Sequence, residues 1–242
     1  MRYWPQKPPL GVPVNWGDPL AQGLVGCWLM NEGGGNTVYD LSGNGHAGTK
    51  NPTTPWIAGD SGPALRFDAA ELTNTLYLAN DTALVSDAWS VVMRIKPDDI
   101  ATNTILFGWD GLQPSLYLQL GSGKAPLLYM GSSNYTYIHT SAFTAMHDGN
   151  WHTVVCTMPG NANADILSAK FYVDTVLYPL GAWDSGGAAT AKVGLRLCGP
   201  RQHISREYDG DVSWAMYYNR ALSASEIAQL YMTPFRIFQE SF

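Results

Sequence analysis

The stretch Gly26-Cys27-Trp28-Leu29-Met30-Asn31-Glu32-Gly33-Gly34-Gly35 is followed a few residues later by Asp40-Leu41-Ser42-Gly43-Asn44-Gly45-His46-Ala47-Gly48. The first stretch begins as an apolar run typical of a β-strand and ends in a cluster of glycines. The second is dense in Asp, Ser, Gly and Asn. Glycine adopts positive φ angles without steric cost, and Asp, Asn and Ser side chains hydrogen-bond to nearby backbone. Both segments therefore predict turns rather than helices.

Short β-rich runs recur along the rest of the chain. In the run Trp89–Ile95, residues 89, 91, 93 and 95 are apolar, so they share one face of an extended strand. Runs at this spacing, without helical patterns between them, are typical of an antiparallel sandwich or jelly roll. The sequence predicts strands at Leu24–Met30, Ala64–Phe67, Leu76–Leu78, Trp89–Ile95, Asn103–Trp109, Ser115–Leu120, Leu127–Met130, Tyr135–Thr140, His152–Met158, Lys170–Val176, Lys192–Leu197 and Asp211–Asn219.

One segment near the C-terminus has helical features. Ser223 can serve as an N-cap, and Glu226, three residues later, completes a capping box. Pro234 would end this helix. We therefore predict an all-β fold, an antiparallel two-sheet jelly-roll sandwich with one short C-terminal helix.

The composition limits the classes of function. A chain of 242 residues has the size of one large β-sandwich, since all-β domains commonly reach that length. A net charge of −6 argues against nucleic acid and anionic membranes as partners, because both attract basic patches. No run approaches the ~20 apolar residues that a membrane span needs. The start of the chain, Met1–Pro5, lacks the apolar core of a signal peptide.

The three cysteines are Cys27, Cys156 and Cys198. Their number is odd, they are widely spaced, and they form no CxxC motif. We predict free, buried thiols in a protein made in a reducing compartment.

The order and spacing of several motifs resemble the laminin-G-like jelly-roll family, within the concanavalin A-like lectin and glucanase superfamily. The resemblance extends roughly from Gly23 to Tyr231 and implies the same sandwich fold. Thr175 stands where family members usually have Gly. The function stays open, because such sandwiches include lectins, enzymes and structural proteins. Besides the opening stretches, the motifs are Gly62–Asp68, Trp89–Pro97, Asp148–Val155, Phe171–Asp174, Tyr208–Val212 and Tyr217–Ile227.

The resemblance also raises the question of calcium. Family members usually carry an Asp at the position of Ser213, where it often helps to hold a structural calcium ion. Hard cations need six to eight oxygen ligands. The candidate Ca²⁺ ligands here are Asp40, Asn44 and Asp211, together with loop carbonyls. The alternative is that these residues only form turns.

A hydrolytic site is not expected. Retaining glycosidases place two carboxyl groups about 5–5.5 Å apart, and glucanases of this superfamily do so with a Glu-x-Asp-x-x-Glu strand. Glu207-Tyr208-Asp209 begins this pattern, but Val212 stands at the third carboxylate position. We predict no catalytic residues. His152 is interpreted as a packed, hydrogen-bonded side chain rather than a base.

Sugar binding would use aromatic rings beside polar groups. Candidates in or beside predicted loops are Trp56, Trp109, Tyr135, Tyr137 and Trp183. For each of them, packing between the two sheets is the alternative.

The two ends of the chain differ from its middle. We divide the chain into a proline-rich arm at 1–22, a jelly-roll domain at 23–232 and a tail at 233–242. The arm contains Trp4 and Trp16, and proline stiffens it. It either packs on its own sandwich or anchors another chain. The many terminal aromatic residues lead us to expect a homo-oligomer with arm and tail at the contacts.

Three terminal stretches resemble laminin-G-like proteins encoded in the structural gene clusters of tailed phages. They are Val12–Trp16, Leu20–Gly26 and Tyr231–Phe238. The resemblance implies a virion component, a capsid decoration or tail-associated module made in the host cytoplasm. Its partners would be other virion proteins, itself or a cell-surface polysaccharide. The alternatives are a free-standing lectin and, as a third reading, a glycan-active enzyme.

Overall fold

The computed structural model describes residues 6–68, 76–78, 87–98, 104–110, 117–120, 127–129, 135–138, 140–160, 163–184, 193–198 and 208–239. One group of strands comprises β1 (Leu24–Trp28), β4 (Trp56–Ala58), β5 (Pro63–Phe67), β7 (Trp89–Pro97), β12 (His152–Met158), β13 (Lys170–Val173), β14 (Val176–Tyr178) and β17 (Gly210–Tyr218). The other comprises β2 (Thr37–Val38), β3 (Gly48–Lys50), β6 (Leu76–Leu78), β8 (Thr104–Asp110), β9 (Tyr117–Leu120), β10 (Leu127–Tyr129), β11 (Tyr135–Ile138), β15 (Leu180–Asp184) and β16 (Val193–Leu197). The helices are α1 (Thr140–Met146) and α2 (Ala224–Met232), with 3-10 turns η1 (Pro19–Ala21) and η3 (Asn163–Ser168).

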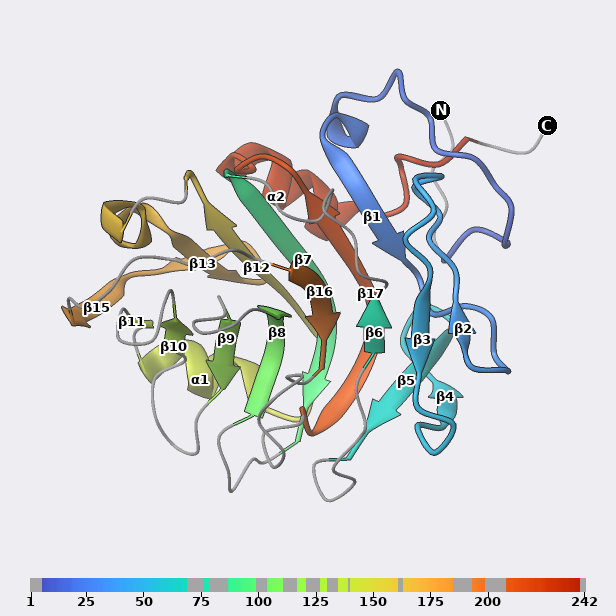
Figure 1. Ribbon diagram of the computed structural model, residues 1–242, viewed down its shortest axis with the longest axis horizontal. Coiled ribbons are helices and arrows are strands. Elements are labelled where there is room, and N and C mark those ends of the chain that lie inside the picture. Colours follow the sequence, from blue (N-terminus) through green and yellow to red (C-terminus); the bar gives the residue numbers. More distant parts are fainter. Residues whose placement is uncertain are drawn as a thin grey trace.

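The strands form two antiparallel sheets that stack as layers (Figure 1). The eight-stranded sheet has the order β14-β13-β12-β7-β17-β5-β4, and β1 pairs with β17 as well. The nine-stranded sheet has the order β15-β11-β10-β9-β8-β16-β6-β3-β2. The predicted all-β sandwich with a C-terminal helix is therefore confirmed.

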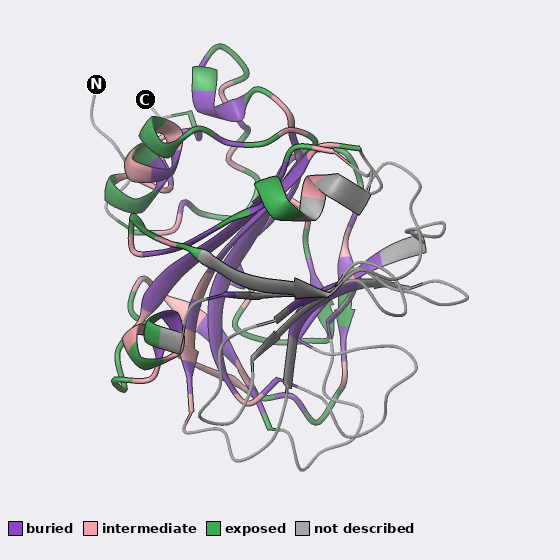
Figure 2. Ribbon diagram, turned by 90° about the vertical axis from the view of Figure 1, so that its left-hand side faces the viewer, coloured by how far each residue is buried: buried purple, intermediate pink, exposed green. Residues whose placement is uncertain are grey.

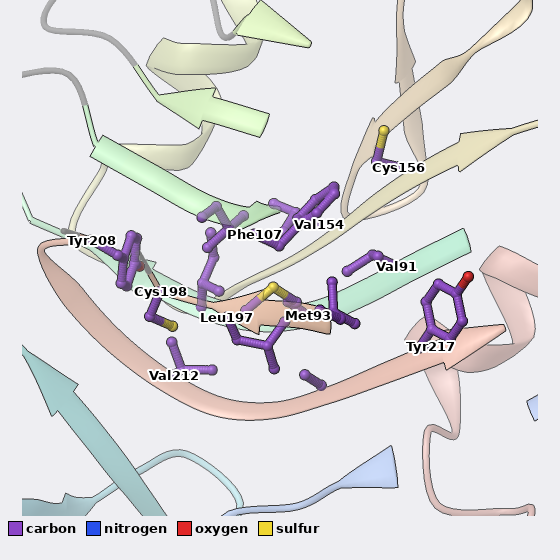
Figure 3. Packing of buried hydrophobic residues seen from close by; sticks show 14 of the residues in the cluster. Val91, Met93, Phe107, Val154, Cys156, Leu197, Cys198, Tyr208, Val212 and Tyr217 are labelled. Carbon is purple, nitrogen blue, oxygen red and sulfur yellow. The ribbon is translucent and has the colours of Figure 1, made fainter. Parts of the chain in front are cut away.

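The core lies between the two sheets. Val91 and Met93 of β7 face Phe107 of β8 and Leu197 of β16 (Figure 3), and all four are at most 2% exposed. Val91 and Met93 belong to the predicted apolar face of their strand. Burial of each such side chain contributes about 1.5–3 kcal/mol to stability.

Two local predictions need correction. The predicted strand Lys170–Val176 is a hairpin, β13 and β14, which turns at Asp174 and Thr175 with φ angles of 53° and 95°. The predicted strand Tyr135–Thr140 ends early, and a short helix that the sequence did not suggest, α1, begins at Thr140. Ala142 and Met146 of this helix are buried in the core.

A second apolar cluster covers the other face of the eight-stranded sheet. Val92 and Trp214 contribute from the strands, and Ile227 of α2, Phe238 of the tail and Val14 of the arm pack over them. For this reason β12 and β17 are buried along their whole length, as Figure 2 shows.

The arm and the tail also pair with each other. Val14 forms a β-bridge with Phe238, and the Asn15 amide donates a hydrogen bond of 2.7 Å to the Ile237 carbonyl. The tail aromatics Phe235 and Phe238 are therefore buried within their own chain rather than left as an apolar patch. Trp16, in contrast, is 47% exposed; Trp4 lies outside the described residues.

Within the described residues, no helix has the length and apolar character to cross a membrane.

Candidate functional site

The Asp40 side chain organises the turn that follows β2. Its Oδ1 accepts hydrogen bonds of 2.9 Å from the amides of Cys27 and Ser42. Its Oδ2 accepts from Ser42 Oγ at 2.8 Å and from the His46 amide at 3.0 Å. Asn44 Nδ2 in turn donates to the Val25 carbonyl at 3.0 Å. These bonds fasten the turn to β1.

Asp211, the third candidate calcium ligand, lies elsewhere. It sits on β17 opposite Arg66 of β5, and Arg66 Nη1 donates to its Oδ1 at 3.3 Å. Asp98 and Asp209 bind the same guanidinium. The hydrogen bond from Arg66 lowers the pKa of Asp98, whereas burial raises the pKa values of Asp209 and Asp211.

The three candidate calcium ligands have other partners in this structure. The Asp40 carboxylate already accepts four hydrogen bonds from the chain, which a cation would have to displace, and Asp211 is paired with a guanidinium. Among the described residues, no three His, Cys, Asp or Glu side chains form a group that could hold a metal ion. Calcium binding stays a prediction.

The broken carboxylate pattern of β17 falls at a buried position. Val212, at the third position of that pattern, is 0% exposed in the main core. Asp209 is held by Arg66, and Glu207 lies outside the described residues. The arrangement supplies no nucleophile and acid pair among the described residues of this strand.

His152 is packed as expected. Its side chain is 8% exposed, and both ring nitrogens contact carboxylates, Nε2 with Asp148 Oδ1 at 2.8 Å and Nδ1 with Asp174 Oδ2 at 2.6 Å. It joins the loop before β12 to the β13–β14 turn.

Of the five aromatic candidates for sugar binding, Trp56 is the one whose side chain the structure describes. It lies on β4 opposite the buried Leu65 and packs against the main core. Its Nε1 donates to the Gly35 carbonyl at 3.0 Å, and Lys50 Nζ lies 5.9 Å from its ring centroid. These contacts favour a structural role.

Strand register separates the other four candidates. Trp109 lies opposite Leu195, and Trp183 lies opposite Thr136, which in turn pairs with Leu128. Leu195 and Leu128 are buried in the core, so both tryptophan positions belong to the core face of the nine-stranded sheet.

Tyr135 and Tyr137 alternate with Thr136 and therefore occupy the outer face of that sheet. The structure thus keeps two of the five candidates together on a face that does not form the core.

Register places further residues in line with Tyr135. Directly paired residues form one line across the neighbouring strands from β6 to β11, and we call this line the outer row. Its members are Tyr77, Arg196, Gly108, Tyr117, Tyr129 and Tyr135. It continues to Thr49 on β3 and to Asp184 on β15.

The chain neighbours of this row show which face it occupies. Leu76, Phe107, Leu128 and Leu197 each adjoin a member of the outer row along the chain, and all are buried in the core. Successive residues of a strand point to opposite faces. By register the outer row therefore belongs to the face turned away from the core. Of its described members Arg196 is half-buried and Gly108 is buried, while the adjoining Thr49 is exposed.

Sequence reasoning missed Tyr77, Tyr117 and Tyr129. Each sits beside a leucine in a short strand, a weak sign of an alternating pattern. Their alignment depends on strand pairing and could not be found from local sequence.

Residues 68–228 match a family model of laminin G type, described as the concanavalin A-like lectin/glucanases superfamily. The chain belongs to this superfamily. No curated protein matches the chain by sequence.

Solved structures of this superfamily fold resemble the chain at low identity. Domain 4 of AbnA, an extracellular arabinanase from Geobacillus stearothermophilus in complex with arabinotriose, gives a TM-score of 0.62 at 18% identity, covering 86% of this chain and 98% of that one. The binding domain of Paraclostridial Mosquitocidal Protein 1 gives 0.61 at 13%, covering 88% and 52%.

A sialidase of Trypanosoma rangeli in complex with the inhibitor DANA gives a TM-score of 0.62 at 16% identity, covering 86% of this chain. The chain spans about a third of that enzyme, 32% of its length. At these identities the likeness shows the fold alone.

Proposed function

We propose that the chain is a non-catalytic carbohydrate-binding module whose binding face is the outer side of the nine-stranded sheet. The observation that carries this proposal is the outer row, which brings four tyrosine positions and an arginine onto one face of adjacent strands. Aromatic rings with a polar end suit sugars, whose rings have apolar faces and polar edges.

The eight-stranded sheet offers less room for a ligand. Part of its outer face is covered by α2, the arm and the tail. Elsewhere its charged side chains bind one another, as in the pairs Arg94–Asp60 at 2.8 Å and Arg66–Asp211 at 3.3 Å. A ligand there would have to displace these contacts.

The absence of catalysis is part of the proposal. The buried Val212 and the Arg66-bound Asp209 support it, because a retaining mechanism needs two available carboxyl groups on one face. Sustained release of sugar from a polysaccharide panel, abolished in Glu207→Gln, would contradict it.

Binding itself is tested by affinity electrophoresis in gels that contain neutral or acidic polysaccharides. We expect retardation in at least one gel, and Tyr129→Ala should remove it. Tyr231→Ala is the matched control, because Tyr231 is 39% exposed on α2, over the other sheet. Retardation that both variants retain would exclude the outer row as the binding face.

We further propose that the module works on a phage particle, as a capsid decoration or tail-associated protein. The terminal stretches that resemble phage structural proteins support this, and in the fold the two ends pair through Val14 and Phe238 as one unit. Mass spectrometry of purified particles from the source should detect the chain in stoichiometric amounts.

A further inference from the structure

Both sheets end on the same side of the molecule, with two strands that follow each other in the chain. β14 is the last strand of the eight-stranded sheet, and β15 is the last strand of the nine-stranded sheet. Pro179 alone connects them, and Figure 1 shows β15 at one end of the molecule. Within the described residues, β14 pairs with β13 and β15 pairs with β11, so each has a neighbouring strand on one side only.

The exposure of β14 follows from its place at this edge. Val176 is 56% exposed and Leu177 is 50% exposed. Successive residues of a strand point to opposite faces, so an open face on one side of the sheet would expose only one of them. Their partners on β13, Val173 and Tyr172, are buried. Both side chains are therefore exposed because no strand lies beside β14.

The turn before β14 determines where its backbone groups point. Asp174 and Thr175 both have positive φ angles, 53° and 95°, the pattern of a type I′ hairpin turn. The residues that flank this two-residue turn, Val173 and Val176, form a hydrogen-bonded pair, and such pairs alternate with non-bonded pairs along the ladder. Leu177 therefore directs its amide and its carbonyl away from β13. These groups suit one further antiparallel strand.

The charge of this edge favours a second copy of the chain as that neighbour. The segment Thr175–Pro179 contains no charged residue, whereas edge strands of soluble proteins often carry charges that prevent pairing. Asp174, just before it, is already bound by His152 and Arg94. Because each chain has a net charge of −6, two copies repel each other least where uncharged surfaces meet.

A second copy also fits by symmetry. With a two-fold axis at Leu177, this residue lies opposite Leu177 of the other copy, and the two exchange both backbone hydrogen bonds. Val176 then lies opposite Tyr178 of the other copy, an apolar and aromatic pair on one face. A strand as short as β14 buries less than the ~1,200 Å² of a standard interface. The same axis brings the two β15 edges together, so the second layer adds to the contact.

We propose that the chain forms a symmetric dimer in which β14 pairs antiparallel with β14 of a second copy around Leu177, so that both sheets continue across the interface. The arm and the tail take no part in this contact. The dimer does not depend on carbohydrate binding, and each proposal can fail without the other.

Sedimentation equilibrium of the native protein over a range of concentrations should show a monomer and a dimer. Leu177→Lys should raise the dissociation constant of the dimer at least about tenfold, because it places two like charges directly opposite each other. Met232→Lys is the matched control, since Met232 is 75% exposed on α2. It should leave the dissociation constant unchanged. Thermal unfolding shows whether both variants keep the fold.

A mixture of two variants tests the symmetry of the contact. Leu177→Glu alone should weaken the dimer as Leu177→Lys does, and an equimolar mixture of the two should restore it, because opposite charges then face each other. Hydrogen exchange of the Leu177 amide should slow as the native protein is concentrated.

Three results would overturn the proposal. One is a native protein that stays monomeric at millimolar concentration. Another is a dissociation constant that Leu177→Lys changes no more than Met232→Lys does. The third is a mixture of the Lys and Glu variants that associates no better than either variant alone.

Discussion

His152 Nδ1 lies 2.6 Å from Asp174 Oδ2, and its Nε2 lies 2.8 Å from Asp148 Oδ1. An ionised carboxylate can only accept hydrogen bonds, so both ring nitrogens must donate, which requires the imidazolium form. The hydrogen bond to Asp174 raises the pKa of His152 against the effect of burial, and Asp148 adds to the rise. His152 is thus a charged side chain that links the loop before β12 to the β13–β14 turn.

The ion pairs of His152 should make the stability of the fold depend on pH. The pKa of His152 is raised in the folded state, so its contribution is fully present below the unfolded value of about 6.5 and is lost as the pH rises through the folded value. We expect the difference in melting temperature between the native protein and His152→Gln to be largest near pH 5.5 and to shrink by pH 9. Arg94 Nη1 also lies 3.8 Å from Asp174 Oδ1. A difference that grows with pH would contradict the imidazolium assignment.

The turn between β13 and β14 contains a strained residue. Thr175 has φ of 95° and is exposed, and this region is unfavourable for a β-branched side chain. Thr175→Gly should raise the free energy of unfolding by about 1 kcal/mol, since glycine removes the strain. Urea unfolding measures it, with Thr175→Ala as the control that keeps a Cβ. Equal stabilities of the two variants would show that the φ angle of Thr175 does not destabilise the turn.

Gly210 at the start of β17 has no room for a side chain. Its φ is +140°, and an added Cβ would lie 2.6 Å from both the Lys96 carbonyl and Tyr208 Oη. Gly210→Ala should therefore lower the free energy of unfolding by about 1–3 kcal/mol more than Gly43→Ala. Gly43 also has a positive φ, +81°, but nothing lies within 4 Å of its added Cβ. Similar losses in the two variants would contradict this packing around β17.

The three cysteines are free and buried, as the sequence predicted. Burial also raises the pKa of each thiol, so the reactive thiolate is scarce. Alkylation of the native protein should label none of them within minutes, whereas alkylation in denaturant should label all three. Mass analysis counts the labels, and a pair that never reacts would reveal a disulfide.

Local sequence patterns predicted those parts of the fold that local chemistry determines. The alternation in β7 and the capping box of Ser223 and Glu226 are both present. Helix α1 was missed because its sequence, Thr-Ser-Ala-Phe-Thr-Ala-Met, has no acidic residue in its first turn and continues a β-rich run.

The candidate site was only partly predictable for a different reason. Tyr135 and Tyr137 were recognised as aromatic residues near loops, but the row they join depends on pairs such as Arg196 with Gly108, which are far apart in sequence. Strand register is decided by which faces must be buried over the whole sheet. The same long-range packing gave the tail aromatics an internal role that composition did not suggest.

The roles of the two terminal segments can be separated by one pair of substitutions. Phe238 is 3% exposed in the second apolar cluster, whereas Trp16 is 47% exposed. Phe238→Ala should lower the free energy of unfolding by about 3–5 kcal/mol, because it leaves a cavity over the eight-stranded sheet. Trp16→Ala should change stability by about 0.5 kcal/mol or less.

Sedimentation of the same two variants tests the expected assembly. If the arm also joins copies of the chain, Trp16→Ala should reduce the oligomer while the monomer keeps its melting temperature. If the native protein is monomeric at every concentration, the arm and tail serve only to cover their own sheet. In that case the homo-oligomer expected from the terminal aromatics is wrong, and Trp16 needs another explanation.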